Sequence, residues 1–337
     1  MAGNAKQKLK LMCISKILMS ETDENHPLDA IEICELLLKD FDINAERKSI
    51  YDDINVLIDF GLDIIKTRTP KTGYFIASRD FDLPEVSLLV DAVESANFIT
   101  PKKTKMLVSK LEGLLSCHEA EDIHKKVFIE NRNKCSNEEI FYNIDILHSA
   151  VNNRKKVRFI YIRRVMGDNN RIAESAKEMV VNPYALVWEN DHYYLIGNID
   201  KYNNLIHLRL DRMKRVTELK TTVRHFSEVS PYKTFFDVAD YTRKSFNMFG
   251  GELKTIELKC KDNQLEQVVD RFGNKLYLRK NDDGTFTFST KANISEGLIS
   301  WLLQFGGDIE ALSPVELRKS IIDRIEKIGK IYGSGRS

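Results

Sequence analysis

The stretch between residues 180 and 216 limits the possible folds of this chain most, because β-prone runs alternate there with tight turns. Asn190 and Asp191 separate the first two runs, and both residue types tolerate positive φ, so they predict a hairpin turn. The runs rich in Val, Ile, Leu and Tyr cover 180–188, 192–197 and 205–210, with a closing run up to 216. Short strands joined by tight turns predict a small, strongly bent sheet or barrel.

Length and composition set broader limits. A chain of 337 residues exceeds one average domain, so we expect two to four domains. Hydrophobic residues make up 42% of the chain, enough for buried cores, yet no run has the apolar length of a membrane span. The five cysteines are scattered and form no C-x-x-C pair, which argues against a metal site or a disulfide framework. We therefore expect a cytoplasmic protein that uses no metal and no cofactor.

The N-terminal segment predicts a helix-turn-helix followed by a β-hairpin, or wing. Asp29 and Glu32 have the spacing of a capping box at the start of the second helix, and Asn44 is the expected N-cap of the third. Apolar spacing and turn residues place helices over 6–19, over 29–40 and from 44 onward, and strands over 63–67 and 74–76.

A basic and aromatic face on the third helix predicts contact with DNA. Its side chains can donate to base edges and phosphates, while those of the hairpin can reach the backbone. The candidate residues are Arg47, Lys48, Ser49, Tyr51 and Asn55 of the helix and Lys66, Arg68 and Lys71 of the hairpin. The alternative is an ordinary solvated helix, and it has support: residues 6–75 carry ten Lys or Arg against thirteen Asp or Glu, a net charge of −3.

The chain also resembles a known family. The run from Pro183 to Leu186, the triplet Tyr193-Tyr194-Leu195 and the sequence Leu208-Arg209-Leu210-Asp211-Arg212 look like the WYL domain of bacterial transcriptional regulators. Tyr193 stands where that family has Trp. Residues 1–78 resemble the winged helix that precedes WYL domains, and the segments 271–273, 301–306 and 312–318 resemble the C-terminal extension that follows them.

Arginines and aromatic residues in the central segment form a candidate ligand site. Guanidinium groups suit phosphates and tyrosine rings suit bases, so the site predicts a nucleotide or single-stranded nucleic acid as effector. The candidates are Tyr161, Arg163, Tyr193, Tyr194, Leu195, His207, Arg209 and Arg212. The resemblance implies an effector-sensing role for the triplet and for Arg209 and Arg212. Without it, these residues could simply line a solvated face of the sheet. We interpret residues 163–177 as a polar loop near this site.

The C-terminal segment alternates strands and helices. The expected strands are 254–260, 275–279, 285–290 and 309–312, and the expected helices are 263–272, 295–304 and 314–330. This βαββα order predicts a ferredoxin-like sheet with helices on one face. Trp301 has helical spacing with Leu298 and Phe305 and is interpreted as a core residue.

These elements predict an α+β multidomain protein. The expected domains are a winged helix-turn-helix over 1–78, a helical connector over 79–135, an SH3/Sm-like small β-barrel of the WYL type over 136–228, and a ferredoxin-like domain over 229–337.

The sequence contains no recognisable catalytic motif, so we do not expect an enzyme. We expect a ligand-responsive transcriptional regulator that binds a double-stranded operator as a homodimer, without a membrane partner. The alternative is an RNA- or single-stranded-DNA-binding sensor or accessory protein, in which the central segment binds nucleic acid as its main task.

Overall fold

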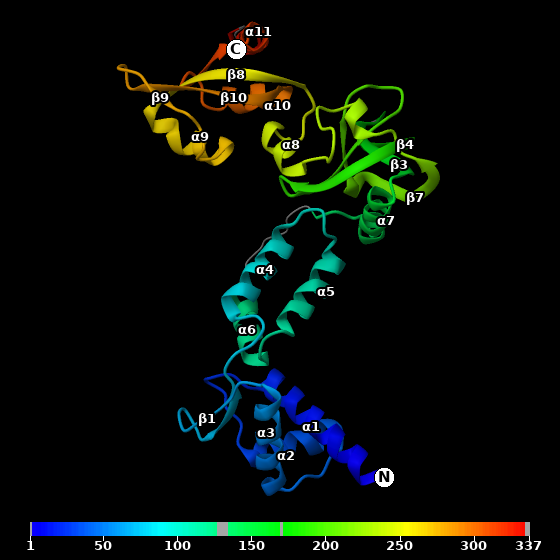
Figure 1. Cartoon of the computed structure of the whole chain (residues 1–337), viewed down its shortest axis with the longest axis vertical. Coiled ribbons are helices and arrows are strands. Elements are labelled where there is room, and N and C mark those ends of the chain that lie inside the picture. The colour runs from blue at the N-terminus through cyan, green and yellow to red at the C-terminus, as the bar shows by residue number, and fades with distance from the viewer. Residues whose placement is uncertain (1, 127–133, 169–170, 334–337) are drawn as a thin grey trace. The chain divides into compact units, whose positions relative to one another are not determined.

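The computed structural model describes residues 2–126, 134–168 and 171–333, which divide into two compact units, Met1–Ser136 and Asn137–Ser337. Figure 1 labels their helices and strands. Within the described ranges, no helix combines the length and apolarity that a bilayer crossing requires.

The first unit begins with three helices and an antiparallel hairpin (Figure 1). These are α1 (Ala2–Glu21), α2 (Ala30–Phe41), α3 (Arg47–Phe60), β1 (Ile64–Thr67) and β2 (Gly73–Ile76). Their fully buried side chains form one core that includes Ile14, Leu18, Ile33, Leu37, Ile50 and Ile54. The capping box at Asp29 is confirmed: its carboxylate accepts from the Ile31 and Glu32 amides, and Glu32 accepts from the Asp29 amide.

The start of α3 differs from the expectation. Its N-cap is Glu46, which makes no side-chain cap bond, so the prediction of Asn44 as N-cap is wrong. Asp42 ends α2 in the left-handed region at φ 55°. Ile43 and Ala45 then pack against the core, and this alternation keeps the chain extended through Asn44. Arg47 is therefore in the first turn of α3.

Three further helices complete the first unit: α4 (Leu83–Ser95), α5 (Pro101–Glu112) and α6 (Cys117–Lys126). Their own small core contains Val86, Val90, Val108, Leu115 and Ile123. The start of α6 is fixed to the loop after α1, where Ser116 Oγ donates to Asp23 Oδ2 over 2.7 Å and the rings of His26 and His118 stack with centroids 3.7 Å apart. These contacts explain why the connector belongs to the same compact unit as the first three helices.

The second unit opens with α7 (Ile140–Asn152) and an antiparallel five-stranded sheet in the order β6-β5-β4-β3-β7. Its elements are β3 (Lys155–Met166), β4 (Ile172–Glu189), β5 (His192–Asn198), β6 (Ile206–Arg209), a 3-10 turn (Leu210–Arg212) and β7 (Met213–Thr222). Asn190 and Asp191 have φ of 49° and 58°, which confirms the hairpin turn. The described residues contain no ladder between β6 and β7, so the sheet is open.

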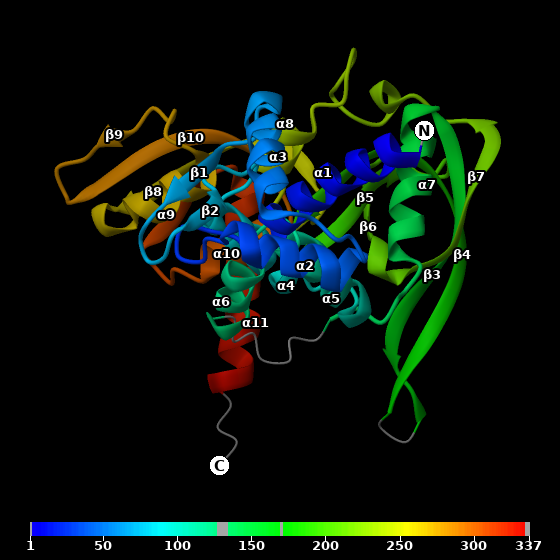
Figure 2. The ribbon, with the colours of Figure 1, turned by 90° about the horizontal axis from the view of Figure 1, so that it is seen from below.

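The interpretation of 163–177 as a loop is wrong. Paired residues continue to Met166 and Ile172, and Arg163 lies opposite Ser175. Figure 2 shows the ends of β3 and β4 as a two-stranded ribbon. Both faces of this ribbon are largely exposed, so polar side chains suit either face of the strands and the sequence lacks the alternation of a half-buried strand.

The rest of the second unit is a four-stranded antiparallel sheet in the order β11-β8-β10-β9. It follows a 3-10 turn (Phe226–Glu228) and α8 (Val238–Lys244), and it contains β8 (Glu252–Lys261), a 3-10 turn (Asp262–Gln264), α9 (Leu265–Phe272), β9 (Arg279–Lys280), β10 (Thr285–Ile294), α10 (Glu296–Leu303), β11 (Ile309–Ser313) and α11 (Val315–Gly333). Insertion of β10 between β8 and β9 agrees with a split βαβ order. The strand expected over 275–279 is shorter in the structure, where β9 contains only Arg279 and Lys280. Trp301 packs 5.5 Å from Phe246 and Phe272 between ring centroids, as a core residue should.

The ion pair between Lys10 and Asp53 tests the packing of α1 on α3. Lys10 Nζ lies 2.7 Å from Asp53 Oδ2, and the side chains are 12% and 11% exposed. Lys10→Met leaves this carboxylate buried without its counter-charge, so we expect the opening free energy of α1–α3 amides, measured by hydrogen exchange, to fall by about 3 kcal/mol. Lys8→Met, at an exposed position of α1, is the control and should cost under about 0.5 kcal/mol. Equal losses in both variants would contradict this expectation.

Candidate DNA interface and ligand pocket

Exposed polar side chains of α3 and of the β1–β2 hairpin form the candidate DNA interface. Arg47, Lys48 and Asn55 are exposed on α3, and Lys66 and Arg68 are exposed on the hairpin. Side chains in the first turn of a recognition helix are those that reach base edges in the major groove. The late start of α3 places Arg47 and Lys48 in the first turn of this helix.

A row of cations and rings connects α3 to the hairpin. Arg47 Nε donates to the Tyr51 hydroxyl over 2.9 Å, and its guanidinium lies 5.8 Å from the centroid of that ring. Tyr51 is 6.3 Å from the Tyr74 ring, over which Lys66 Nζ lies at 5.6 Å. These contacts hold the basic side chains of the helix and of the hairpin in one arrangement.

Two of the predicted DNA-contact residues have partners within the protein. Ser49 is half-buried and accepts a hydrogen bond from Lys10 Nζ over 3.0 Å, so its hydroxyl supports the packing of α1 on α3. Lys71 forms an ion pair with Glu32 of α2. Because Lys71 is exposed, this pair contributes little and can exchange for a phosphate.

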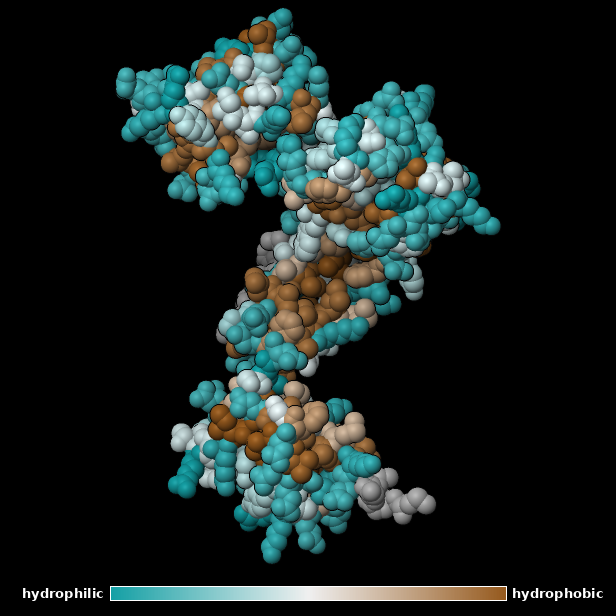
Figure 3. All heavy atoms as spheres, viewed as in Figure 1, coloured by the Kyte–Doolittle hydropathy of each residue, from teal (hydrophilic) through white to brown (hydrophobic). Residues whose placement is uncertain are grey.

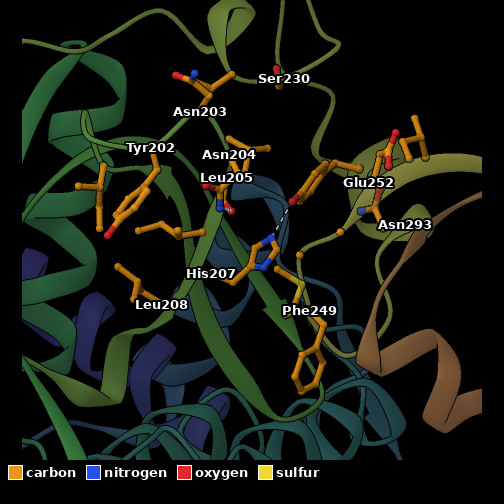
Figure 4. A pocket seen from close by; sticks show the side chains of 18 of the residues that line it. Tyr202, Asn203, Asn204, Leu205, His207, Leu208, Ser230, Phe249, Glu252 and Asn293 are labelled. Carbon is orange, nitrogen blue, oxygen red and sulfur yellow. Dashed lines mark hydrogen bonds between the residues drawn. The ribbon is translucent and has the colours of Figure 1, made fainter. Parts of the chain in front are cut away.

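The second unit contains a cavity of about 1080 Å³, just above the usual range for ligand pockets of about 300–1,000 Å³. Figure 4 shows side chains that line it. The walls come from the sheet (Tyr161, Arg163, Lys177, His207), the β5–β6 loop (Tyr202, Asn203, Asn204), the segment around α8 (Tyr232, Tyr241, Lys244, Phe249) and the C-terminal sheet (Glu252, Asn293).

A hydrogen bond between His207 and Tyr241 fixes the centre of the pocket. His207 Nε2 and the Tyr241 hydroxyl are 2.7 Å apart, and Figure 4 shows this contact as a dashed line. Burial lowers the pKa of His207 to about 4 and raises the pKa of Tyr241 to about 12. Both groups are therefore uncharged near neutral pH, and the bond joins β6 to α8.

The charged side chains line other parts of the pocket wall than His207 and Tyr241. Arg163 and Lys177 project from the β3–β4 ribbon, with the Arg163 guanidinium 5.9 Å from the Tyr161 ring centroid. Lys244 forms an ion pair with Asp240, and Glu252 is the one carboxylate among the lining residues. Arg163 and Lys177 therefore give this side of the pocket a positive charge suited to an anion.

Some of the predicted ligand residues line the pocket and others do not. Tyr161, Arg163 and His207 line the pocket. Tyr194 and Arg209 lie opposite each other on β5 and β6, and they gather with Arg212 around Asp211. Leu195 is fully buried and pairs with Leu208 in the sheet, so we remove it from the candidate site. Tyr193 does not line the pocket either.

Arg209 has an internal counter-charge. Its Nε and Nη2 donate to the two Asp211 oxygens over 3.0 and 2.7 Å. Burial alone would lower the pKa of Arg209, but the hydrogen bonds and the charge of Asp211 outweigh burial and raise it. An anion would have to displace Asp211 to use this guanidinium fully, which favours Arg163 and Lys177 as anion contacts.

Sequence reasoning missed most of the pocket. Lys177 was missed because residues 163–177 were interpreted as a loop; in the structure it pairs with Tyr161 and so lies beside Arg163. Tyr202, Asn203, Asn204 and Tyr241 come from segments between the regular strands, where no periodicity marks them. In the described ranges, no group of His, Cys, Asp and Glu side chains is arranged to hold a metal ion.

The His207–Tyr241 bond leads to a pH dependence of stability. The pKa of His207 is about 4 in the folded chain against a usual value of 6.5. Neutral His207 thus stabilises the fold fully above pH 6.5, and this contribution is lost as pH falls toward 4. We expect the free energy of unfolding to fall, relative to His207→Gln, by about 3 kcal/mol over this range. Fluorescence of Trp188 and Trp301, both in the second unit, can follow urea unfolding; parallel pH profiles would contradict the assignment.

Comparisons with known proteins agree with the order of these elements. A WYL domain model matches residues 142–218, and a WCX domain model matches residues 252–329. No curated protein matches the chain. One similar solved structure is proteasome accessory factor B/C (PafBC) of Arthrobacter aurescens, with 14% sequence identity and a TM-score of 0.28. The match covers 93% of this chain and 47% of the PafBC chain, so this chain spans about half the length of PafBC. The chain therefore contains a WYL domain followed by a WCX domain.

Proposed function

We propose that this protein is a DNA-binding transcriptional regulator whose WYL domain senses an anionic, nucleotide-like effector. Residues 1–78 act as a winged helix-turn-helix, 79–135 as a connector, 136–228 as the sensor and 229–337 as the C-terminal extension. The regulator acts as a homodimer, because winged helices commonly read two half-sites about a two-fold axis.

The observation that carries the proposal is the exposed first turn of α3 beside a basic hairpin. Arg47 and Lys48 are exposed there, and Lys66 and Arg68 extend the same chemistry to the hairpin. Residues 6–75 have a net negative charge, but most of their carboxylates lie before α3. The surface of the first turn of α3 and of the hairpin is therefore locally basic.

The pocket supports the sensing part of the proposal. Arg163 and Lys177 supply positive charge for a phosphate, Tyr202 supplies an exposed ring for a base, and Asn203 supplies an amide. Such an effector changes DNA affinity only if it binds two conformations of the protein unequally.

The second candidate is an RNA- or single-stranded-DNA-binding accessory protein. The same pocket favours it, because cations and tyrosines suit a single strand as well as a nucleotide. In that case the first unit has a minor role in binding.

The decisive measurement is binding to the duplex upstream of the protein's own gene at fixed salt. Arg47→Ala combined with Lys48→Ala removes two donors from the first turn of α3, so we expect affinity to fall about 30-fold or more. Lys275→Ala with Lys280→Ala is the control, because it removes the same charge from exposed positions of the second unit. Equal losses would show that only net charge matters, and tight single-strand binding without duplex binding would favour the accessory role.

The pocket has its own test. A panel of nucleotides and short single strands is titrated against the duplex complex, and Arg163→Ala with Lys177→Ala should weaken the response to the active compound about 10-fold or more. Arg158→Ala with Lys214→Ala is the matched control, because it removes the same charge from exposed positions of the same sheet that pair with Glu178 and Glu174 and do not line the pocket. An unchanged response in the double variant would place the effector elsewhere.

A further inference from the structure

The walls of the pocket in the second unit differ in charge. The connector helices α4 and α5 expose hydrophobic side chains (Figure 3), but an apolar patch by itself does not define the chemistry of a partner. In the pocket, Arg163 and Lys177 come from the β3–β4 ribbon, whereas Glu252, the one carboxylate among the described lining residues, comes from the C-terminal sheet. A ligand that reaches both walls therefore needs an anionic group and, apart from it, a group that donates hydrogen bonds.

Glu252 and Asn293 lie next to each other on the wall that the C-terminal sheet forms, and we call them the Glu252 corner. Glu252 pairs with Ile294 in the β8–β10 register, so it is a neighbour of Asn293. Figure 4 shows both side chains at the same edge of the pocket. Asn293 Nδ2 donates to Ser245 Oγ over 3.0 Å. An amide nitrogen has two hydrogens, so one N–H of Asn293 is left for a ligand.

The ion pair that Glu252 makes is weak. Its Oε2 lies 3.3 Å from the Nζ atom of Lys254, two residues along the same strand, and the Glu252 side chain is 76% exposed. An ion pair as exposed as this one contributes little free energy. Both oxygens of the carboxylate are therefore available to accept hydrogen bonds from a ligand.

The hydrogen-bonding edges of the nucleobases differ in how well they fit such a corner. An ionised carboxylate only accepts, so its two oxygens match two adjacent donors. Guanine has such a pair in N1–H and its exocyclic amine, with the O6 acceptor on the other side of N1. Adenine and cytosine have an amine beside a ring nitrogen that accepts, and uracil and thymine have one N–H between two carbonyls. A carboxylate repels these additional acceptors, so guanine fits best.

We propose that the Glu252 corner selects guanine, and that the effector is a guanine nucleotide, either free or within a short single strand. Glu252 accepts from N1–H and from the exocyclic amine, while the remaining N–H of Asn293 donates to O6. Phe249 lines the same pocket with its side chain 49% exposed, so it offers the base a ring in addition to that of Tyr202.

This inference rests on the proposed function, because it starts from an anionic, nucleotide-like effector and adds the identity of the base. Arg163 and Lys177 keep their role as contacts of the phosphate. The Glu252 corner affects only the choice among bases, so the two parts of the site are separable by experiment.

Guanosine and inosine monophosphate test the corner directly, because they differ only in the exocyclic amine. Binding to the full chain is measured by titration calorimetry at fixed salt. We expect the guanosine compound to bind at least about 10-fold more tightly than the inosine or adenosine monophosphate. A five-nucleotide single strand with one central guanine is compared with the same strand carrying hypoxanthine there. A preference among the mononucleotides identifies a free nucleotide as the effector, and a preference in the strand alone identifies a single strand.

Glu252→Gln replaces one acceptor oxygen by a donor and keeps the size of the side chain. In this variant the affinities for the guanine and hypoxanthine forms should come within about 3-fold of each other, because the amine loses its acceptor. Glu257→Gln is the matched control and should keep the preference, since Glu257 is a half-buried glutamate of the same strand that does not line this pocket. Circular dichroism shows that each variant remains folded.

Three results would contradict the inference. Equal affinity for the guanine and hypoxanthine forms in the wild type, or an unchanged preference in Glu252→Gln, would overturn it. If nucleotides bind without a preference for a base and Arg163→Ala with Lys177→Ala weakens them, the proposed effector class stands and only the selection of guanine fails. If neither nucleotides nor single strands bind, both the effector class and the selection of guanine fail.

Discussion

A buried amide network at the bend of β4 holds the WYL domain together. Asn182 is 1% exposed, and its Nδ2 donates to the Asn198 carbonyl and to Asp200 Oδ1, while its Oδ1 accepts from the Arg224 amide over 2.9 Å. Here β4 passes from pairing with β3 to pairing with β5, and the register shifts between Pro183 and Ala185. A strand that changes partners leaves backbone groups unpaired, and the amides satisfy those groups in place of water.

The same network builds one wall of the pocket. Asn198 Nδ2 donates to the carbonyls of Tyr202 and Asn204 over 2.8 and 2.9 Å. These bonds fix the β5–β6 loop, from which Tyr202, Asn203 and Asn204 line the cavity. The bend in the sheet and the shape of the ligand pocket therefore have a common cause.

Local patterns explain how much of this could be predicted from the sequence. The Asn190-Asp191 turn, the capping box at Asp29 and the order of the C-terminal elements follow from interactions between near neighbours, and each is confirmed. Asn44 failed as a cap because the burial of Ile43 and Ala45 decides where α3 begins, and burial depends on distant residues. The ribbon over 163–177 was missed because two exposed faces impose no alternation.

The candidate site was only partly predictable for a related reason. Tyr161, Arg163 and His207 lie on strands, whose alternation shows which side chains share a face, but Tyr241 meets His207 through a contact between residues 34 positions apart. The same contact also changes the charge expected for this site. His207 is buried and neutral, and Arg209 forms an ion pair with Asp211. These two basic residues therefore add little positive charge to the pocket. In the proposed function, recognition of an anion therefore depends on Arg163 and Lys177, which are exposed on the β3–β4 ribbon and so available to a ligand.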